Sequence, residues 1–474
     1  MDRHRTRHPR RRGNRRKTSL PKGLERVNLD AAGIDVGSRS HHVAVGPGRD
    51  KDGRDVREFG SFTCDLQAIA DWLETCGVDT VAMESTGVYW IPLYEVLENR
   101  GFQVILVDPT KLKRAPGRKT DVKDCQWLQE LHTYGLLSGA FRPDDDICRL
   151  RGLVRQRETL VKQSSLHIQH IQKALTQMNV KLREVVREVT GVTGMRIVRA
   201  ILDGERDPSK LASHRDRRCK NDASTLAKAL DGNWRDEHLF ALRQSVQLLD
   251  YCAQLIADCD QEIEKLLASY DEIPGTTAVA TAAPLNRRRH EAHFDLHSAL
   301  VRMTGVDLTK IEGIQALTAL KIVSEIGTDM TKWPSAKHFA SWLCLCPGNK
   351  ITGGRRLSGR TTPSANRVAT ALRIAAQTLW RSKSALGAFL RRMAARHGMP
   401  KAITATAHRL ARMIYSMLRY GTDYVMRSQL EYEQQHLAHR KVSIIRQAQA
   451  LGLFVVDPHL HQQPTTATSL PSGA

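Results

Sequence analysis

The sequence predicts an α/β domain with a mixed sheet, followed by long helices and a mostly helical C-terminal domain. Two observations lead to this fold class. Short apolar segments alternate with helix-like spacings over residues 30–146, and a seven-residue apolar repeat begins at Ile147. The 474 residues are enough for two or three domains with a sizeable core.

The first domain, residues 30–146, is expected to contain five strands. Strand-like apolar segments occupy residues 31–37, 41–45, 57–62, 80–84 and 103–108, and helical spacing marks residues 66–76, 89–100 and 121–134. Gly77 and Gly101 follow the first two of these helices and are typical helix ends. Three strands in a meander, then strands alternating with helices, indicate a mixed sheet covered by helices, an order that fits a ribonuclease-H-like fold.

Four acidic residues stand at the ends of these elements. Asp35 and Glu84 lie near the ends of apolar strands, while Asp121 and Asp124 are three residues apart at the start of a helix and so share one face. Each acid alone could be a solvated end of a strand or helix. Together they predict a Mg²⁺ site, because Mg²⁺ prefers a few carboxylates with water and substrate phosphate. Asp108 is a further strand-end acid, which we interpret as structural.

The charge balance indicates a polyanionic partner. The net charge is +22 and the isoelectric point is near 9.8, which favours nucleic acid, although a generally basic surface kept for solubility is the alternative. Lys119 and Lys123 flank the acids and are expected to hold phosphates. The N-terminus lacks the apolar core of a secretory leader, and no apolar run approaches the roughly 18 residues of a membrane span. With nine scattered cysteines, we expect a cytoplasmic protein without a membrane partner.

Three motifs resemble those of the DEDD-type insertion-sequence transposases, the bridge-RNA-guided recombinases with a RuvC-like N-terminal domain. They are residues 32–37 (AGIDVG), 83–90 (MESTGVYW) and 119–124 (KTDVKD), and the resemblance extends over residues 31–430. It implies a metal-binding tetrad made of Asp35, Glu84, Asp121 and Asp124. It also implies DNA partners (the element ends and the target), a structured guide RNA, a dimer or tetramer, and action at the bacterial nucleoid.

Long helices are expected over residues 147–270. Apolar residues recur every seven positions from Ile147 to Leu182 and again from Leu242 to Tyr270, with Arg157 and Ser164 as breaks in the second seam position of the first repeat. The two helices could pack as a hairpin within one chain or pair between chains, and the family resemblance favours a dimerising coiled coil. Residues 1–29 are expected to form a basic disordered arm.

The remaining chain is expected to comprise a linker (residues 271–304), a C-terminal transposase domain (residues 305–432) and a tail (residues 433–474). The linker shows no apolar period. Residues 311–327 suggest a helix, a glycine turn at Gly313 and a second helix, which resembles a helix-hairpin-helix. Such a turn could present backbone N–H groups to phosphate, although a plain helical hairpin would have the same pattern.

A Gly-rich basic segment follows at residues 342–360. The resemblance implies a nucleophilic Ser just before a glycine here, thought to form a covalent link to DNA, and the matching position holds Thr352. A Thr hydroxyl can act as a nucleophile, but its β-methyl group restricts attack, so Ser358 is the alternative. Four arginines are expected to bind nucleic acid: Arg355, Arg356, Arg360 and Arg367.

The sequence therefore predicts a transposase that cuts and rejoins DNA with Mg²⁺ and a hydroxyl nucleophile from the C-terminal domain. Two alternatives remain open. One is a metal-dependent nuclease for branched DNA that uses no covalent step. The other is a non-catalytic scaffold that binds nucleic acid.

Overall fold

The structure is a computed structural model, and it describes residues 24–85, 87–108, 121–270, 290–421, 434, 437–439 and 441–454, apart from the side chains of Lys350 and Arg356. Lys119, most of the expected basic arm, residues 271–289 of the expected linker and the last part of the tail lie outside the described residues. The chain divides into two compact units, Met1–Arg142 and Pro143–Ala474. Among the helices of the described ranges, none has the length and apolar character that a membrane span requires.

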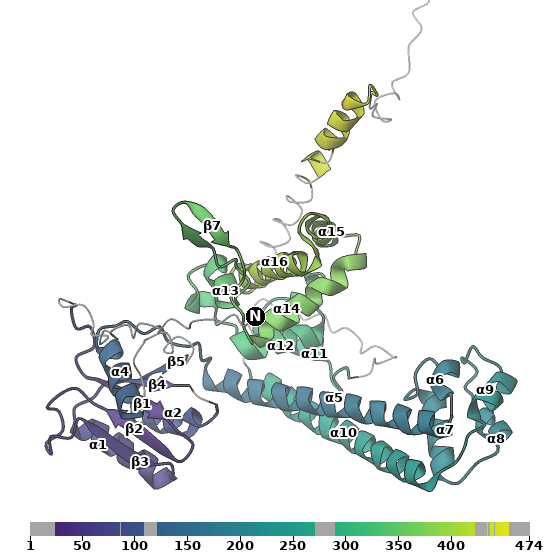
Figure 1. The fold of residues 1–474 in the computed structure, drawn as a ribbon, viewed down its shortest axis with the longest axis horizontal. Coiled ribbons are helices and arrows are strands. Elements are labelled where there is room, and N and C mark those ends of the chain that lie inside the picture. The colour runs from purple at the N-terminus through teal and green to yellow at the C-terminus, as the bar shows by residue number, and fades with distance from the viewer. Residues whose placement is uncertain are drawn as a thin grey trace, which may run out of the picture. The chain divides into compact units, whose positions relative to one another are not determined.

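Unit 1 contains the expected mixed sheet (Figure 1). Its strand order is β3-β2-β1-β4-β5, with antiparallel pairing across β3, β2 and β1 and parallel pairing across β1, β4 and β5. The strands are β1 Ala31–Val36, β2 Ser40–Ala44, β3 Val56–Gly60, β4 Thr80–Glu84 and β5 Gln103–Val107. The meander and the alternation predicted from the sequence are confirmed, with bounds that differ by one or two residues.

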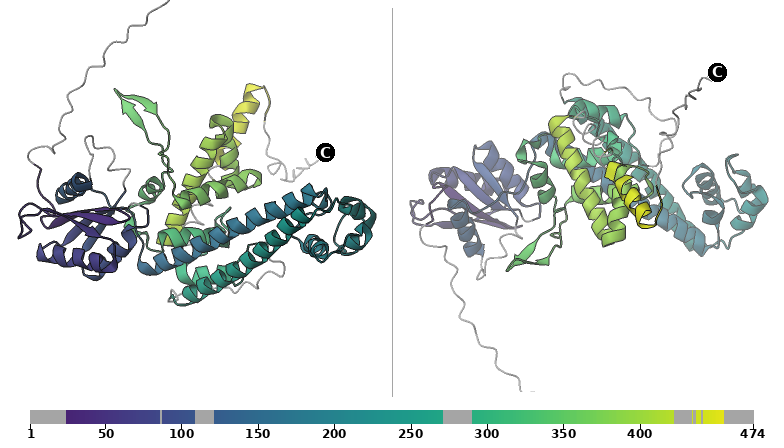
Figure 2. Two further views of the ribbon diagram at one scale, coloured as in Figure 1. Left: turned by 60° about the horizontal axis from the view of Figure 1, so that its bottom comes forward. Right: turned by 90° about the horizontal axis from the view of Figure 1, so that it is seen from above.

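Helices cover both faces of this sheet (Figure 2). On one face α1 (Thr63–Thr75) and α2 (Trp90–Asn99) form the main core with strand residues such as Ile34 and Met83. On the other face α4 (Asp121–Thr133) packs through Leu128 on Ala82 and Val107. Since neighbouring residues of a strand point to opposite faces, each strand presents one set of side chains to α4 and the other to α1 and α2.

The contact between α4 and β1 is a backbone contact made possible by Gly33. A Cβ atom at this position would lie 2.3 Å from the Gln129 backbone nitrogen and 2.4 Å from the Cys125 carbonyl oxygen. Both atoms belong to α4 and cannot move aside as a flexible side chain could. A side chain at residue 33 would therefore force α4 away from the sheet.

The C-terminal end of α4 is held by hydrogen bonds. The Thr80 hydroxyl on β4 donates to the Gln103 carbonyl at 3.0 Å, so its oxygen accepts from Nε2 of His132 at 2.9 Å. Asn28 donates from its side chain to the His132 carbonyl at 2.7 Å, and the Val27 backbone N–H donates to the Thr133 carbonyl at 2.8 Å. Burial lowers the pKa of His132 to about 4, so the imidazole that makes this contact is neutral.

Unit 2 is built on two long helices that lie along each other within one chain (Figure 1). They are α5 (Asp145–Gln177) and α10 (Asp236–Ala268), and the apolar repeats predicted from the sequence supply their contact, with Leu150, Val154, Leu249 and Ile256 buried. The polar break at Arg157 has a partner: its guanidinium donates to the buried carboxylate of Asp260 with N–O distances of 2.5 and 3.2 Å.

The first of these helices ends earlier than its apolar repeat. Asn179 adopts a left-handed conformation with φ of 58°, and the Lys181 N–H donates to the Ala229 carbonyl instead of continuing the helix. Leu182 then contributes to the core of a helical cap at the far end of the pair. The cap comprises α6 Leu182–Val185, α7 Val192–Leu202, α8 Pro208–Ser213 and α9 Ala223–Leu230.

The described part of the expected linker is folded. Asp260 also binds His293, whose Nδ1 lies 2.7 Å from the carboxylate, and Arg157 donates to the His290 carbonyl at 2.9 Å. A helix, α11 (Leu296–Thr304), then begins with the Asp295 side chain as its cap. Residues 290–304 are therefore ordered although their sequence shows no apolar period. Buried polar groups of α5 and α10, Arg157 and Asp260, hold the start of this segment.

The C-terminal helices pack on one another and on α5. They are α12 Ala316–Ile326, α13 Ala336–Trp342, α14 Arg367–Thr378, α15 Ala385–His397 and α16 Met399–Tyr420, with short 3-10 turns at Leu308–Lys310, Met330–Lys332 and Leu379–Arg381. The element that precedes Gly313 is the first of these 3-10 turns, which ends at Lys310, whereas the sequence suggested a helix before the glycine turn. A further helix occupies residues 441–450, inside the expected tail.

We expect Gly33→Ala to destabilise unit 1, because the added methyl group has no space against the α4 backbone. Overpacking of this kind costs about 1–3 kcal/mol, which should appear as a lower apparent Tm in circular dichroism. Gly152→Ala is a matched control, since Gly152 lies within α5 and a Cβ there meets nothing within 4 Å. The control should raise stability slightly by its helix propensity, and a Gly33→Ala variant as stable as wild type would contradict the packing described.

A pH-dependent loss of stability is expected from His132. Its pKa in the folded protein, about 4, lies below its ordinary value of 6.5, so the unfolded chain binds a proton more readily. The free energy of unfolding should therefore fall as pH decreases from about 6.5 toward 4 and change no further below that range on account of this residue. Urea unfolding of wild type and His132→Gln across this range measures the effect, and equal pH dependence in the two proteins would refute it.

Candidate active site

Asp35 and Glu84 lie side by side on the sheet face that α4 covers. Ile34 and Met83 are partners in the parallel ladder of β1 and β4, and each acid is the next residue along its strand. Strand alternation puts Asp35 on the same face as Gly33, and Glu84 on the same face as Ala82, the two residues that α4 contacts. Asp108, by the same alternation from Val107, belongs to the opposite face.

Asp121 and Asp124 occupy the first turn of α4. They are three residues apart and share one helix face, and the positive end of the helix dipole favours carboxylates at this position. Asp121 is exposed and Asp124 is half-buried. The close contact at Gly33 brings this helix against the strand that carries Asp35, so the four acids gather at one end of unit 1.

The electrostatics of Asp35 reflect this arrangement. Burial, followed by the charges of Glu84, Asp121 and Asp124 in that order of importance, raises its pKa to about 6, while His42 opposes the shift. A carboxyl group whose pKa is raised by three neighbouring carboxylates lies where a positive charge would be most stabilising. The four carboxylates predicted from the sequence therefore share one electrostatic environment.

His42 is a neighbour of the site that the sequence did not single out. It pairs with Asp35 across the β1–β2 ladder and with Glu58 across the β2–β3 ladder, so the three side chains form a row on one face of the sheet. Its Nε2 lies 3.8 Å from the Glu58 carboxylate. The sequence predicted the two strands that carry Asp35 and His42, but it did not give the register that makes these two residues cross-strand partners.

The donor set suits a hard divalent cation. Four carboxylates with one raised pKa provide oxygen ligands and excess negative charge, the chemistry that Mg²⁺ binds. Within the described ranges, no three Asp, Glu, His or Cys side chains converge as a formed metal cluster. The acids are thus electrostatically coupled without forming a closed ligand cluster among the described residues.

The two candidate hydroxyls of unit 2 lie on a two-stranded ribbon. It consists of β6 (Lys350–Thr352) and β7 (Arg355–Ser358), joined by Gly353 and Gly354, which both have positive φ. Thr352 is exposed, whereas Ser358 is half-buried and its oxygen accepts from the Arg360 N–H at 3.2 Å.

The ribbon register places the two hydroxyls at different distances from the turn. Thr352 pairs with Arg355 next to the two glycines, whereas Ser358 pairs with Lys350 at the far end of the ribbon. The register shifts between Lys350 and Ile351, so simple strand alternation does not carry from one hydroxyl to the other.

The predicted cationic residues differ in their surroundings. Arg355 and Arg360 are exposed on or beside the ribbon, and Lys123 is exposed on α4. Arg367 instead forms ion pairs with Glu158 of α5 and Glu325 of α12. The side chain of Arg356 lies outside the described part of the structure.

Glu325 is the centre of an ion-pair network that the sequence did not reveal. This nearly buried carboxylate accepts two hydrogen bonds of 2.8 Å from Arg155 and lies 3.3 Å from Arg151. Glu158 binds Lys321 at 2.7 Å as well as Arg367. The network fastens α12 and α14 to α5.

The chain matches two protein-family models. Residues 32–180 match a model for DEDD transposases of the IS110 type, which is described as a transposase, and residues 305–391 match the transposase IS116/IS110/IS902 family. No curated protein shows significant sequence similarity to the chain. The first match contains all four acids, and the second contains Thr352, Ser358 and all four candidate arginines.

Proposed function

Because the chain belongs to the DEDD-type transposases of the IS110 family, enzymes that recombine DNA by strand transfer, we propose that Asp35, Glu84, Asp121 and Asp124 form its Mg²⁺ centre. The observation that carries this proposal is the raised pKa of Asp35, to about 6, to which the other three acids contribute. In this proposal the enzyme cuts and rejoins DNA at the ends of its insertion sequence and at the target.

Bound Mg²⁺ supplies Lewis-acid stabilisation of the charge that develops on a phosphodiester. Asp35 and Glu84 hold their positions through the rigid sheet, and Asp121 and Asp124 through the docked helix α4. His42, beside Asp35, is placed to donate to its carboxylate and limit its movement. Lys119 and Lys123 are proposed to hold the phosphate backbone next to these acids.

We place the nucleophile at Thr352, with Ser358 as the alternative. Two facts support this choice: Thr352 is exposed, and it shares a ribbon face with Arg355, whose guanidinium can bind the phosphate under attack. The Thr352 oxygen would bond to phosphorus, the bond from phosphorus to a deoxyribose oxygen would break, and the departing oxygen would take up a proton. Rejoining reverses these steps. Arg356 and Arg360 complete the proposed nucleic-acid contacts of this segment, and Arg367 is a weaker candidate because it already pairs with Glu158 and Glu325.

Other features of the proposal come from the family resemblance. A structured RNA of the same element would guide the enzyme, and chains would associate as dimers or tetramers, with α5 and α10 as a coiled coil. The turn at Gly313 before α12 would act as a helix-hairpin-helix phosphate contact. The protein would act in the bacterial cytoplasm, at the nucleoid.

Covalent trapping tests the proposed mechanism. The full chain would be incubated with labelled element-end DNA, Mg²⁺ and the noncoding RNA of the element, and protein-linked DNA measured on denaturing gels. Thr352→Ala should abolish the link, Thr352→Ser should retain it, and Ser358→Ala should retain it, because a hydroxyl at residue 352 is what the proposal requires. Asp35→Asn should reduce the linked product by about a hundredfold or more.

The outcomes separate the alternatives. Loss of the link in Ser358→Ala with retention in Thr352→Ala would move the nucleophile to Ser358. Cleavage without any link, unaffected by either substitution, would indicate a metal-dependent nuclease for branched DNA. Activity that is unchanged in both Asp35→Asn and Asp121→Asn would overturn the proposed metal centre, and Tm measurements verify that each variant is folded.

A further inference from the structure

The helical cap at the far end of α5 and α10 lies outside both family matches, because the first match ends at residue 180 and the second begins at residue 305 (Figure 1). It contains a polar segment, the cap loop, which comprises residues 214–222 between α8 and α9. The loop has four Lys or Arg residues and two Asp residues. Neither the four acids of unit 1 nor the ribbon hydroxyls belong to this part of the chain.

Hydrogen bonds fix the cap loop on the neighbouring helices. The Asp216 backbone N–H donates to the Thr193 hydroxyl in the first turn of α7 at 3.0 Å. The Asn221 amide donates to the carbonyl of Val185, the last residue of α6, at 2.7 Å. Within the loop, the Cys219 N–H donates to the Asp216 carbonyl at 2.9 Å. Since the backbone is already ordered, binding through this loop requires little further ordering.

The acids of the cap loop are already engaged. Asp216 binds Arg218, whose Nε lies 2.9 Å from the carboxylate, and this hydrogen bond lowers the pKa of Asp216 to about 2. Asp222 caps α9 by accepting from the Thr225 N–H at 2.9 Å. Among the residues that the structure describes, no carboxylate pairs with the other cations of the loop. Three exposed cations therefore remain: Arg215, Arg217 and Lys220.

A cation of α7 adds to this group. Arg196 is one helical turn along α7 from Thr193, and its side chain is exposed. Its charge also contributes to the lowered pKa of Asp216, after the hydrogen bonds from Arg218. Arg196 therefore lies close to the cap loop, on the helix to which the loop is anchored.

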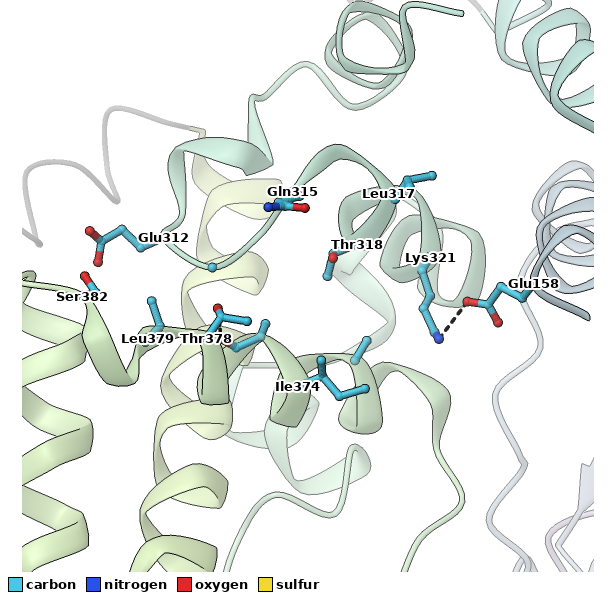
Figure 3. A pocket seen from close by; sticks show the side chains of 13 residues that line it. Glu158, Glu312, Gln315, Leu317, Thr318, Lys321, Ile374, Thr378, Leu379 and Ser382 are labelled. Carbon is cyan, nitrogen blue, oxygen red and sulfur yellow. Dashed lines mark hydrogen bonds and ion pairs between the residues drawn. The ribbon is translucent and has the colours of Figure 1, made fainter. Parts of the chain in front are cut away.

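The cations of the cap loop differ from a paired cation such as Lys321. At the cavity between α12 and α14, the Lys321 amine lies 2.7 Å from the Glu158 carboxylate, so a phosphate there would compete with a carboxylate (Figure 3). In the cap loop, Arg217 and Lys220 make no hydrogen bond or ion pair with the residues that the structure describes. Their N–H groups are therefore available to an external anion.

The chemistry of the cap loop favours phosphate as that anion. Guanidinium and ammonium groups bind phosphate oxygens through charge-assisted hydrogen bonds. Several cations that follow one another along a loop match a ligand with a repeated negative charge. Residues 215–220 include no aromatic side chain that could stack on a base. We therefore expect a contact with the backbone of nucleic acid, which does not depend on base sequence.

We propose that the cap loop binds the phosphate backbone of a nucleic-acid duplex, at a surface separate from the ribbon and from the proposed Mg²⁺ centre. The identification of the polyanion as nucleic acid rests on the proposed function, whereas the unpaired cations do not. The end of α5 at Gln177 lies about 28 Å along this helix from Glu158, which binds α12 and α14. The cap loop would thus extend the nucleic-acid contacts to the end of the long helices. Phosphates are common to DNA and RNA, and the experiment distinguishes the two.

The salt dependence of binding tests this contact. The full chain, in EDTA so that no strand is cut, would be titrated by fluorescence anisotropy at several KCl concentrations. The labelled probes are duplexes of about 30 base pairs, roughly three helical turns, of DNA and of RNA, each in two unrelated sequences. Arg217→Gln with Lys220→Gln should reduce the slope of log K against log[KCl] by about 2, since each phosphate contact contributes about 0.9. The duplex with the larger reduction identifies the natural source. Arg215 is left unchanged, because its hydrogen bond of 3.0 Å to the Cys219 carbonyl helps to order the loop.

Lys162→Gln with Lys173→Gln is the matched control, because it removes two exposed positive charges from α5. Its slope should remain within about 0.5 of the wild-type slope. Equal slopes in wild type and the cap-loop variant would overturn the proposal. An equal reduction in the control would also overturn it, because net charge alone would then set the slope. A reduction seen with one base sequence and not the other would exclude a backbone contact. Circular dichroism verifies that both variants are folded.

Failure of the cap-loop contact can be told apart from failure of the proposed function. In an Asp35→Asn background strand transfer should be lost, while the cap-loop substitutions should still reduce the slope. Covalent trapping by wild type, together with an unchanged slope in the cap-loop variant, would overturn the cap-loop contact alone. A reduced slope in this variant without trapping in wild type would overturn the proposed nucleophile and leave the cap-loop contact standing.

Discussion

The contact between α4 and β1 at Gly33 is the constraint on which the candidate site depends. Two of the four acids are fixed to the sheet, and the other two reach it on a helix that has little apolar surface of its own, with Cys125 and Leu128 as its buried apolar residues. Backbone contact at Gly33 and the hydrogen bond from His132 to Thr80 replace the larger side-chain interface that such a helix usually needs. The mutual repulsion of the acids opposes this docking, so a bound cation and the packing of α4 should reinforce each other.

Much of unit 1 could be predicted from the sequence, because the patterns that mark its strands and helices lie within a few neighbouring residues. Strand alternation, glycine helix ends and acids beside apolar segments are visible within a few residues, and all five strands and three helices followed from them. The contributions of Gly33, His42 and His132 were not visible, since each depends on a partner 7 to about 96 residues away in the chain. A glycine in a strand has many explanations until the helix that lies on it is known.

Unit 2 shows the limit of periodicity. The repeat predicted both long helices and marked Arg157 as a break, but the buried Asp260 that pairs with it is 103 residues away. The repeat also continued past Gln177, where the chain turns at Asn179, because Leu182 fits a helical seam and a cap core equally well. Residues 290–304 lack a period and are nonetheless folded, since polar contacts to Asp260 and an Asp295 cap hold them. The spacing of apolar residues predicts which helix face is buried, but it does not predict buried ion pairs such as that between Arg157 and Asp260.

The ion pairs also change what the net charge means. A charge of +22 suggests that each basic cluster contacts nucleic acid, yet Arg155, Lys321 and Arg367 are already paired with Glu158 or Glu325. Releasing such a cation to a phosphate would take one partner away from a buried or half-buried carboxylate, which is unfavourable. Arg355 and Arg360, exposed at the ribbon, carry no such penalty among the described contacts. Arg355 and Arg360 beside Thr352 are therefore better candidates for DNA contact than Arg367, which serves first to hold α14 against α5.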